Sequence, residues 1–155
     1  MKKLLNLMLL VALAIGFVSC EQSEYSDRKY QNKLEGEWNL TLINGTLFKN
    51  GTVVQEVSKT LPDEESYQSV EFDFKTDGIY EIDVLLYGET EHRSELGKYS
   101  VIDGKLALYE PDEPEEAIYI DIVEVSNKNL ILKASESSAG GMSATFELHL
   151  EKMYY

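Results

Sequence analysis

Apolar and polar residues alternate with a period of two along most of the chain from Leu34 onward. One such run begins at Tyr80 and continues through Ile82 and Val84, with acidic residues between them. Similar runs occur at residues 38–43, 70–75, 99–101, 106–108, 118–123, 130–133 and 144–151. Alternation with one polar face predicts strands that are half-buried in an antiparallel sheet, and no segment after Lys33 has a long helical period. We therefore expect an all-β domain over residues 34–155, with about eight to ten strands.

Dipeptides that favour tight turns lie between these runs, namely Asn44-Gly45, Asn50-Gly51, Asp77-Gly78 and Asp103-Gly104. Because Gly, Asn and Asp accept positive φ angles, we expect successive strands to be joined by hairpins into an antiparallel meander. Such a meander can form a two-sheet sandwich or close into a barrel, and closure leaves no exposed sheet edge. A barrel of about eight strands is either filled by its own side chains or holds one small ligand.

The N-terminal residues have a different pattern. Lys2 and Lys3 precede an apolar run from Leu4 to Val18, which is shorter than the ~20 residues that a membrane-spanning helix needs. The run ends directly before Cys20, the only cysteine of the chain. A charged start, a short apolar run and a small residue at the end are typical of a secretory signal. With one cysteine, the exported domain has no internal disulfide and depends on its core alone.

The segment Phe17-Val18-Ser19-Cys20 resembles the lipobox of bacterial lipoproteins, with Phe where that pattern prefers Leu. The resemblance implies that residues 1–19 are removed as a signal peptide and that Cys20 then carries acyl chains such as palmitate. Several acyl chains anchor a protein stably to a membrane. Glu21 follows the cysteine, where Asp would indicate retention in the inner membrane, so we expect an outer-membrane lipoprotein of the cell envelope. An ordinary secretory signal with a soluble product is the alternative.

Residues 20–33 are polar and have too little apolar content to pack, so we expect a lipidated tether. The alternative is a short helix over residues 26–33, which would close one end of the fold. The chain has 28 acidic and 14 basic residues, and removal of the signal would change its net charge from −14 to −16. Such a surface repels phosphate groups, which excludes nucleic acid as a partner. Membrane association is therefore expected through Cys20 and not through the protein surface.

Three motifs in the β region resemble those of lipocalin-like domains. Gly36-Glu37-Trp38 is similar to the Gly-x-Trp motif of the first strand in that family. The segment from Phe72 to Tyr80 resembles a family hairpin, and a further resemblance covers residues 97–106. The resemblance implies a lipocalin-like barrel whose floor is closed by Trp38, together with Gly36. It also makes the tryptophan a core residue and not a ligand contact.

No catalytic or metal site can be recognised from the residues. Neither His92 nor His149 accompanies a nucleophile motif such as Gly-x-Ser-x-Gly. On one strand, Glu147, His149 and Glu151 would be roughly 6–7 Å apart per step, which is too far for one tetrahedral zinc ion unless a neighbouring strand supplies a ligand. The acidic segments at residues 63–65 and 110–116 lack the spacing of a calcium-binding EF-hand. We therefore expect no enzyme, no metal and no cofactor.

Two functions remain open on the sequence. In the first, the barrel holds a small hydrophobic or amphipathic ligand, against residues that we expect to point inward: Phe72, Phe74, Tyr80, Ile82, Tyr99 and Phe146. In the second, the barrel is filled and the protein is an interaction module, whose acidic loops and C-terminal tyrosines contact an envelope protein partner. An interior cavity favours the first function, and a packed interior favours the second.

Overall fold

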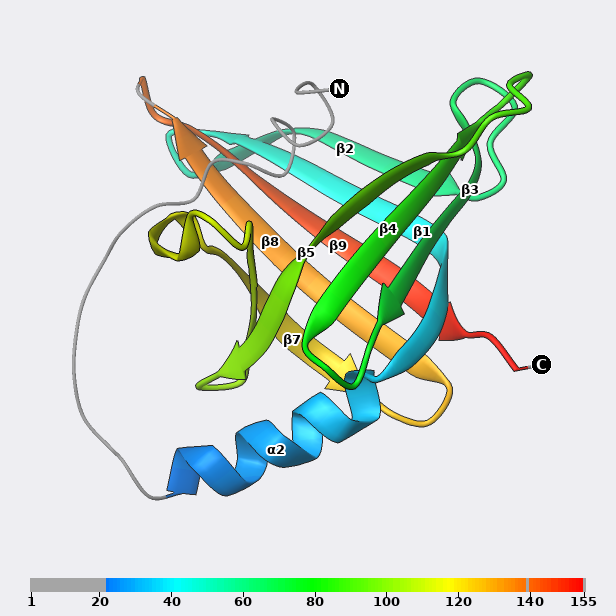
Figure 1. The fold of residues 1–155 in the computed structure, drawn as a ribbon. Coiled ribbons are helices and arrows are strands. Elements are labelled where there is room, and N and C mark those ends of the chain that lie inside the picture. Colours follow the sequence, from blue (N-terminus) through cyan, green and yellow to red (C-terminus); the bar gives the residue numbers. More distant parts are fainter. Residues whose placement is uncertain (1–21, 139, 155) are drawn as a thin grey trace.

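The computed structural model describes residues 22–138 and 140–154. A helix, α2, is followed by nine strands and one short 3₁₀ helix, η1 (Figure 1). In chain order these elements are α2 (Gln22–Leu34), β1 (Gly36–Lys49), β2 (Thr52–Thr60), β3 (Tyr67–Phe74), β4 (Ile79–Leu86), β5 (Arg93–Ile102), β6 (Lys105–Tyr109), η1 (Pro114–Glu116), β7 (Ile118–Val125), β8 (Asn129–Ser138) and β9 (Met142–Lys152).

Within the described residues, the nine strands form one antiparallel sheet that closes on itself. The strand order is β2-β1-β3-β4-β5-β6-β7-β8-β9, and an additional pairing joins β1 to β9 from Trp38 to Lys49. Eight strands, all except β2, therefore form a closed ring. This confirms the predicted all-β barrel and excludes the two-sheet sandwich. Closure satisfies the backbone groups that an open sheet would leave at its two outer strands.

Strand β1 is longer than the sequence pattern predicts, and the turn expected at Asn44-Gly45 is wrong. These two residues lie inside β1, where Gly45 is paired with Phe146 of β9. A Cβ atom on Gly45 would lie 3.3 Å from the phenyl ring of Phe146, so this glycine gives room to a ring instead of allowing a turn. The chain turns at Asn50-Gly51, where φ is 51° and 79°. Turns at Asp77-Gly78 and Asp103-Gly104 are confirmed.

The barrel wall is incomplete at the end opposite α2. One edge of β1 is shared between β3, at Gly36–Asn39, and β2, at Leu42–Lys49, and no ladder joins β2 to β3 in the described chain. Strands β6 and β7 are short and do not reach residues 93–97 of β5 or residues 134–137 of β8. The group β2-β1-β9-β8 and the group β3-β4-β5 consequently diverge toward the top of the view in Figure 1. We call this end the mouth and the α2 end the floor.

Helix α2 occupies the segment that the sequence predicts to be a tether. It packs because its C-terminal Leu34 is fully buried and Tyr30 lies against the core. The carboxylate of Asp27 also accepts hydrogen bonds of 3.0 Å from the backbone N–H groups of Asp103 and Gly104 in the β5–β6 turn. The alternative of a short helix that closes one end of the fold thus describes this segment better than a flexible tether.

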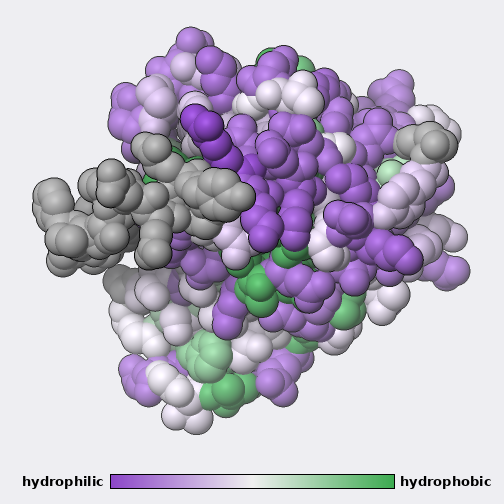
Figure 2. Space-filling model, turned by 90° about the horizontal axis from the view of Figure 1, so that it is seen from below, coloured by the Kyte–Doolittle hydropathy of each residue, from purple (hydrophilic) through white to green (hydrophobic). Residues whose placement is uncertain are grey.

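The outer face of the floor is mostly hydrophilic, with hydrophobic residues in small patches (Figure 2). No helix in residues 22–138 or 140–154 is both long enough and apolar enough to cross a membrane. The expected signal peptide and Cys20 lie outside the described residues, so lipidation stays a prediction.

Candidate functional site

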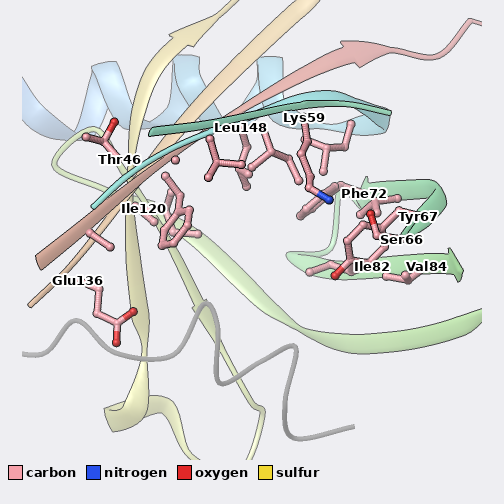
Figure 3. Close-up of a pocket in the computed structure, with 18 of the residues that line it drawn as sticks. Thr46, Lys59, Ser66, Tyr67, Phe72, Ile82, Val84, Ile120, Glu136 and Leu148 are labelled. Atoms are coloured by element: carbon pink, nitrogen blue, oxygen red, sulfur yellow. The ribbon is translucent and has the colours of Figure 1, made fainter. Parts of the chain in front are cut away.

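A cavity of about 590 Å³ occupies the half of the barrel nearest the mouth (Figure 3). Its volume lies within the range of pockets that take drug-sized ligands. Most of its wall is apolar and comes from β1, β3, β4, β7 and β9, including Leu40, Val70, Phe72, Ile82, Ile120 and Leu148. Polar side chains also line the cavity, among them Lys59, Ser66, Arg93, Glu95 and Glu136. In Figure 3, Glu136 lies on the opposite side of the cavity from Ser66 and Tyr67.

Several of the residues that line the cavity are small. Gly45 and Ala134 are both cross-strand neighbours of Phe146, and Ala144 lies one inward position further toward the mouth on β9. By contrast, Trp38 and Phe74 fill the barrel near the floor and are almost completely buried. Because protein interiors are otherwise packed to the density of organic crystals, the smaller side chains in this part of the sheet leave more open volume than the large ones at the floor.

Three of the six residues predicted to line a ligand pocket do line this cavity. They are Phe72 on β3, Ile82 on β4 and Phe146 on β9. Phe72 and Ile82 are direct cross-strand neighbours, which places their side chains together on the inner face. The alternating pattern brings these residues inward as expected.

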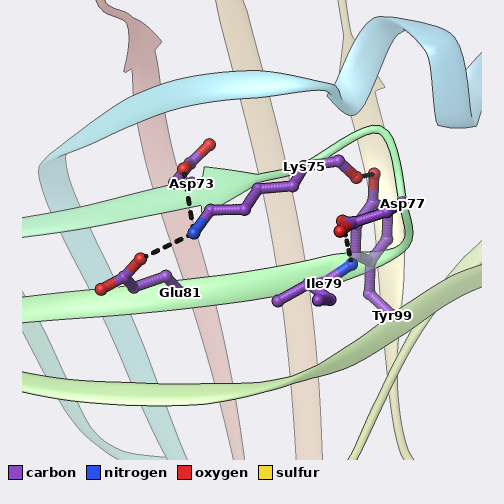
Figure 4. Close-up of polar contacts among 6 residues, drawn as sticks. All are labelled: Asp73, Lys75, Asp77, Ile79, Glu81 and Tyr99. Atoms are coloured by element: carbon purple, nitrogen blue, oxygen red, sulfur yellow. Dashed lines mark hydrogen bonds and ion pairs between the residues drawn. The ribbon is translucent and has the colours of Figure 1, made fainter.

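Phe74, Tyr80 and Tyr99 do not line the cavity and instead belong to the packed core. The rings of Phe74 and Tyr99 meet edge to face, with centroids 5.1 Å apart. The hydroxyl of Tyr99 donates a 2.8 Å hydrogen bond to the backbone carbonyl of Lys75 (Figure 4). The ring of Tyr80 lies so close to Gly97 that a Cβ atom there would be 2.5 Å from it. Burial raises the pKa of both phenols to about 12, so both remain neutral at physiological pH.

The floor contains Gly36 and Trp38. The indole Nε1 of Trp38 donates a 2.7 Å hydrogen bond to the backbone carbonyl of Leu34, at the end of α2. The Nζ atom of Lys152 lies 4.8 Å from the centroid of the indole ring and donates a 2.5 Å hydrogen bond to the carbonyl of Glu35. Gly36 has φ +114°, and a Cβ atom there would be 3.0 Å from Lys152. These contacts join the helix to the first and last strands of the barrel.

A carboxylate in the β2–β3 loop organises one side of the mouth. Asp63 accepts hydrogen bonds from the Nζ atom of Lys59 at 2.9 Å and from the hydroxyl of Ser66 at 2.5 Å. The backbone N–H of Glu65 donates a third, at 3.2 Å. The bond from Lys59, followed by those from Ser66 and Glu65, lowers the pKa of Asp63 to about 2. Two lining residues, Lys59 and Ser66, are thus held by a carboxylate that does not itself line the cavity.

Sequence reasoning missed the charged residues of the mouth. Glu95 on β5 and Glu136 on β8 line the cavity, although neither was among the predicted residues. The alternating pattern does indicate that both residues face inward. Glu136 continues the inward phase of Leu130 and Leu132, and Glu95 is in phase with Tyr99. From the sequence alone, a carboxylate at such a position is interpreted as solvent-exposed, because its height in the barrel is not known.

Each of the two histidines lies beside one carboxylate. His92 Nδ1 lies 3.3 Å from Asp83, and His149 Nε2 lies 2.6 Å from Glu147, each as a simple pair. No group of three or more metal-ligating side chains occurs in the part of the chain that the structure describes. A hollow of about 200 Å³ outside the barrel is lined mainly by carboxylates, namely Glu37, Glu71, Asp73, Glu81 and Asp83.

Lys75 spans part of this acidic hollow. Its Nζ atom lies 3.0 Å from Glu81 and 3.9 Å from Asp73 (Figure 4). Burial raises the pKa of Asp73, while Lys75 lowers it. Glu37, Asp73 and Glu81 are direct neighbours across three strands, an arrangement of like charges that is unfavourable without a cation. Lys75 therefore offsets the repulsion among these neighbouring carboxylates.

No family model matches the chain, and no curated protein sequence matches it. Among solved structures, lobster apocrustacyanin A1 is 11% identical, with a TM-score of 0.51 and coverage of 87% of this chain and 73% of that one. Apocrustacyanin C2 is 13% identical, with a TM-score of 0.50 and coverage of 86% and 72%. Bovine odorant-binding protein with its natural ligand is 14% identical, with a TM-score of 0.45 and coverage of 91% and 79%. The likeness to the crustacyanins, together with the closed antiparallel ring of eight strands, shows that this chain has a lipocalin-like fold.

Proposed function

We propose that this protein binds one small hydrophobic or amphipathic molecule in its barrel and does not catalyse a reaction. The supporting observation is the cavity of about 590 Å³, which is bounded by apolar side chains over most of its wall. Apolar surface that faces water is unfavourable, and covering it with an apolar ligand contributes roughly 25 cal/mol for each Å² removed from water. The cavity also weighs against the alternative of a barrel filled by its own side chains.

We further propose that the protein is anchored to the outer membrane through lipidated Cys20. In support, α2 begins at Gln22, directly after the expected anchor, and covers the floor. A lipid at Cys20 would hold the floor toward the membrane and turn the mouth away from it. The cavity would then take its ligand from the aqueous side of the envelope.

Binding can be tested by isothermal titration calorimetry of the full-length chain in lipid nanodiscs with 1-octanol. The informative variant is Ala144→Phe, because Ala144 lines the cavity and a phenyl group there would occupy part of it. The matched control is Thr145→Phe, the next residue on β9, which does not line the cavity. We expect the wild type and the control to bind octanol alike and Ala144→Phe to bind at least about tenfold more weakly. Equal binding by all three proteins would contradict a ligand in the cavity.

Lipidation can be tested by metabolic labelling with an alkyne analogue of palmitate in a bacterial host. We expect label on the wild type and none on Cys20→Ala, and we expect the labelled protein to sediment with the outer membrane. Label that persists on the variant, or a wild type released as a soluble protein, would reject the anchor.

A protein-interaction role is a second candidate because of β2. In the described chain this strand pairs only with β1, which leaves its other edge open. Val53, Val54 and Val57 on it are 43–51% exposed. An open apolar edge is a common place for a partner to add a strand. A photo-crosslinking residue at Val54 should then give a discrete crosslinked product in cells. The same residue at the exposed Tyr119 on β7 should give none. If neither position gave a product, this role would be contradicted.

A further inference from the structure

The basic side chains that line the cavity already form ion pairs with carboxylates. Lys59 and Arg93 are the basic residues that line it within the described chain. Lys59 Nζ lies 2.9 Å from Asp63, and Arg93 Nη2 lies 2.7 and 3.0 Å from the two carboxylate oxygens of Glu89. Neither Asp63 nor Glu89 lines the cavity. Both positive charges are thus neutralised by groups outside it, and neither is available to an anionic ligand without breaking an ion pair.

Two carboxylates at the cavity have no such partner. Glu95 and Glu136 form no ion pair or hydrogen bond with any residue of the described ranges. Their cross-strand neighbours, Ile82 and Ala144, also line the cavity, so both carboxylates are on the inner face. Both side chains are only partly exposed. A partly buried carboxylate without a partner loses hydration and gains nothing in return.

These two residues lie at the same opening of the barrel wall. Glu95 is within residues 93–97 of β5, and Glu136 is within residues 134–137 of β8, the segments that β6 and β7 do not reach. A ligand that enters between β5 and β8 would pass both carboxylates. Burial, and then repulsion from Glu110, raises the pKa of Glu95, so the loop that contains Glu110 lies near this opening.

The loop between β6 and β7 adds further negative charge. Residues 110–117 contain five acidic residues and no basic one. The repulsion among them, first from Glu116 and then from Glu110, raises the pKa of Glu113. A group of like charges beside an opening attracts ions of the opposite sign and repels ions of the same sign. The opening between β5 and β8 therefore favours the approach of a cation.

We propose that the cavity binds a cationic amphiphile: a protonated amine whose apolar body lies against the inner wall and whose ammonium group lies in the opening that Glu95 and Glu136 border. This inference rests on the proposed function and names the chemical class of the ligand. The apolar wall supplies affinity that any hydrophobic molecule would share. The two carboxylates then select among head groups, because an ammonium group gives them a counter-ion and an anionic head group adds a third like charge.

The test compares three ligands that have the same eight-carbon chain and different head groups: octylamine, 1-octanol and octanoate. Each is titrated at pH 7 by calorimetry into the full-length chain in nanodiscs, and the heat measured with protein-free nanodiscs is subtracted as partitioning into lipid. We expect octylamine to bind about tenfold more tightly than octanol, and octanoate to bind most weakly. The double variant Glu95→Gln, Glu136→Gln should bind octylamine and octanol equally.

A matched control removes two charges elsewhere. Glu124 and Glu151 are exposed and do not line the cavity, so Glu124→Gln, Glu151→Gln should keep the preference for the amine. The proposal is overturned if octanoate binds as tightly as octylamine, if the preference survives in the Glu95, Glu136 double variant, or if the control loses it equally. In those cases octanol still binds and the proposed function stands. If none of the three ligands gives heat above that of protein-free nanodiscs, the proposed function fails together with this inference.

Discussion

Replacement of Trp38 tests whether the floor holds the barrel closed. The side chain is fully buried, and its Nε1 atom donates a 2.7 Å hydrogen bond to the carbonyl of Leu34. Replacing a buried Trp with Ala typically destabilises a protein by about 3–5 kcal/mol. Trp38→Phe retains most of the ring but leaves the carbonyl of Leu34 without this donor, and we expect it to cost about 2 kcal/mol. Domains of this kind are stable by roughly 5–15 kcal/mol, so a loss of this size should move the urea midpoint of Trp38→Ala far below that of the wild type.

The free energy of unfolding can be measured by urea denaturation of each variant. Trp38 is the only tryptophan, so the transition is followed by far-UV circular dichroism instead of intrinsic fluorescence. Tyr119→Ala is the control, because this large aromatic residue on β7 is 47% exposed and its removal should change the free energy by no more than about 0.5 kcal/mol. If Trp38→Ala lost no more stability than Tyr119→Ala, the described packing of α2 against the barrel would be refuted.

Three further substitutions test the core and the mouth. Tyr99→Phe should cost about 1 kcal/mol in a urea titration, because it removes a hydrogen bond to a backbone carbonyl; no loss would contradict that bond. Gly97→Ala should destabilise by about 1–3 kcal/mol, since the new methyl group meets the ring of Tyr80, and a Tyr80→Leu background should remove most of the cost. The hydrogen bond from Lys59 is the largest cause of the lowered pKa of Asp63, so this carboxylate stabilises the fold above pH about 4 and loses the effect as the pH falls toward 2. Asp63→Asn should therefore be less stable than the wild type at pH 7, with a difference that shrinks below pH 4; a constant difference would argue against the ionised contact.

The prediction of the candidate site was incomplete for a physical reason. Alternation correctly placed Phe72, Ile82 and Phe146 on the inner face, but it placed Phe74 and Tyr99 there equally well. Whether an inward side chain meets open space or packed neighbours depends on its height in the barrel and on the size of the residues across from it. Those neighbours come from strands that are distant in the sequence.

The amino-acid sequence by itself determined the class of the fold. Its period of two specified strands with one buried face, and turn residues at Asn50-Gly51 and Asp103-Gly104 specified where hairpins form, because these signals act between residues that are close along the chain. Only the tertiary structure decided that Asn44-Gly45 lies within a strand, since Gly45 there accommodates a ring from β9. It also decided that the polar N-terminal segment is a helix docked by Leu34. In the same way, the cavity and its two unpaired carboxylates involve side chains from strands that are distant in the sequence, so no local pattern predicts them.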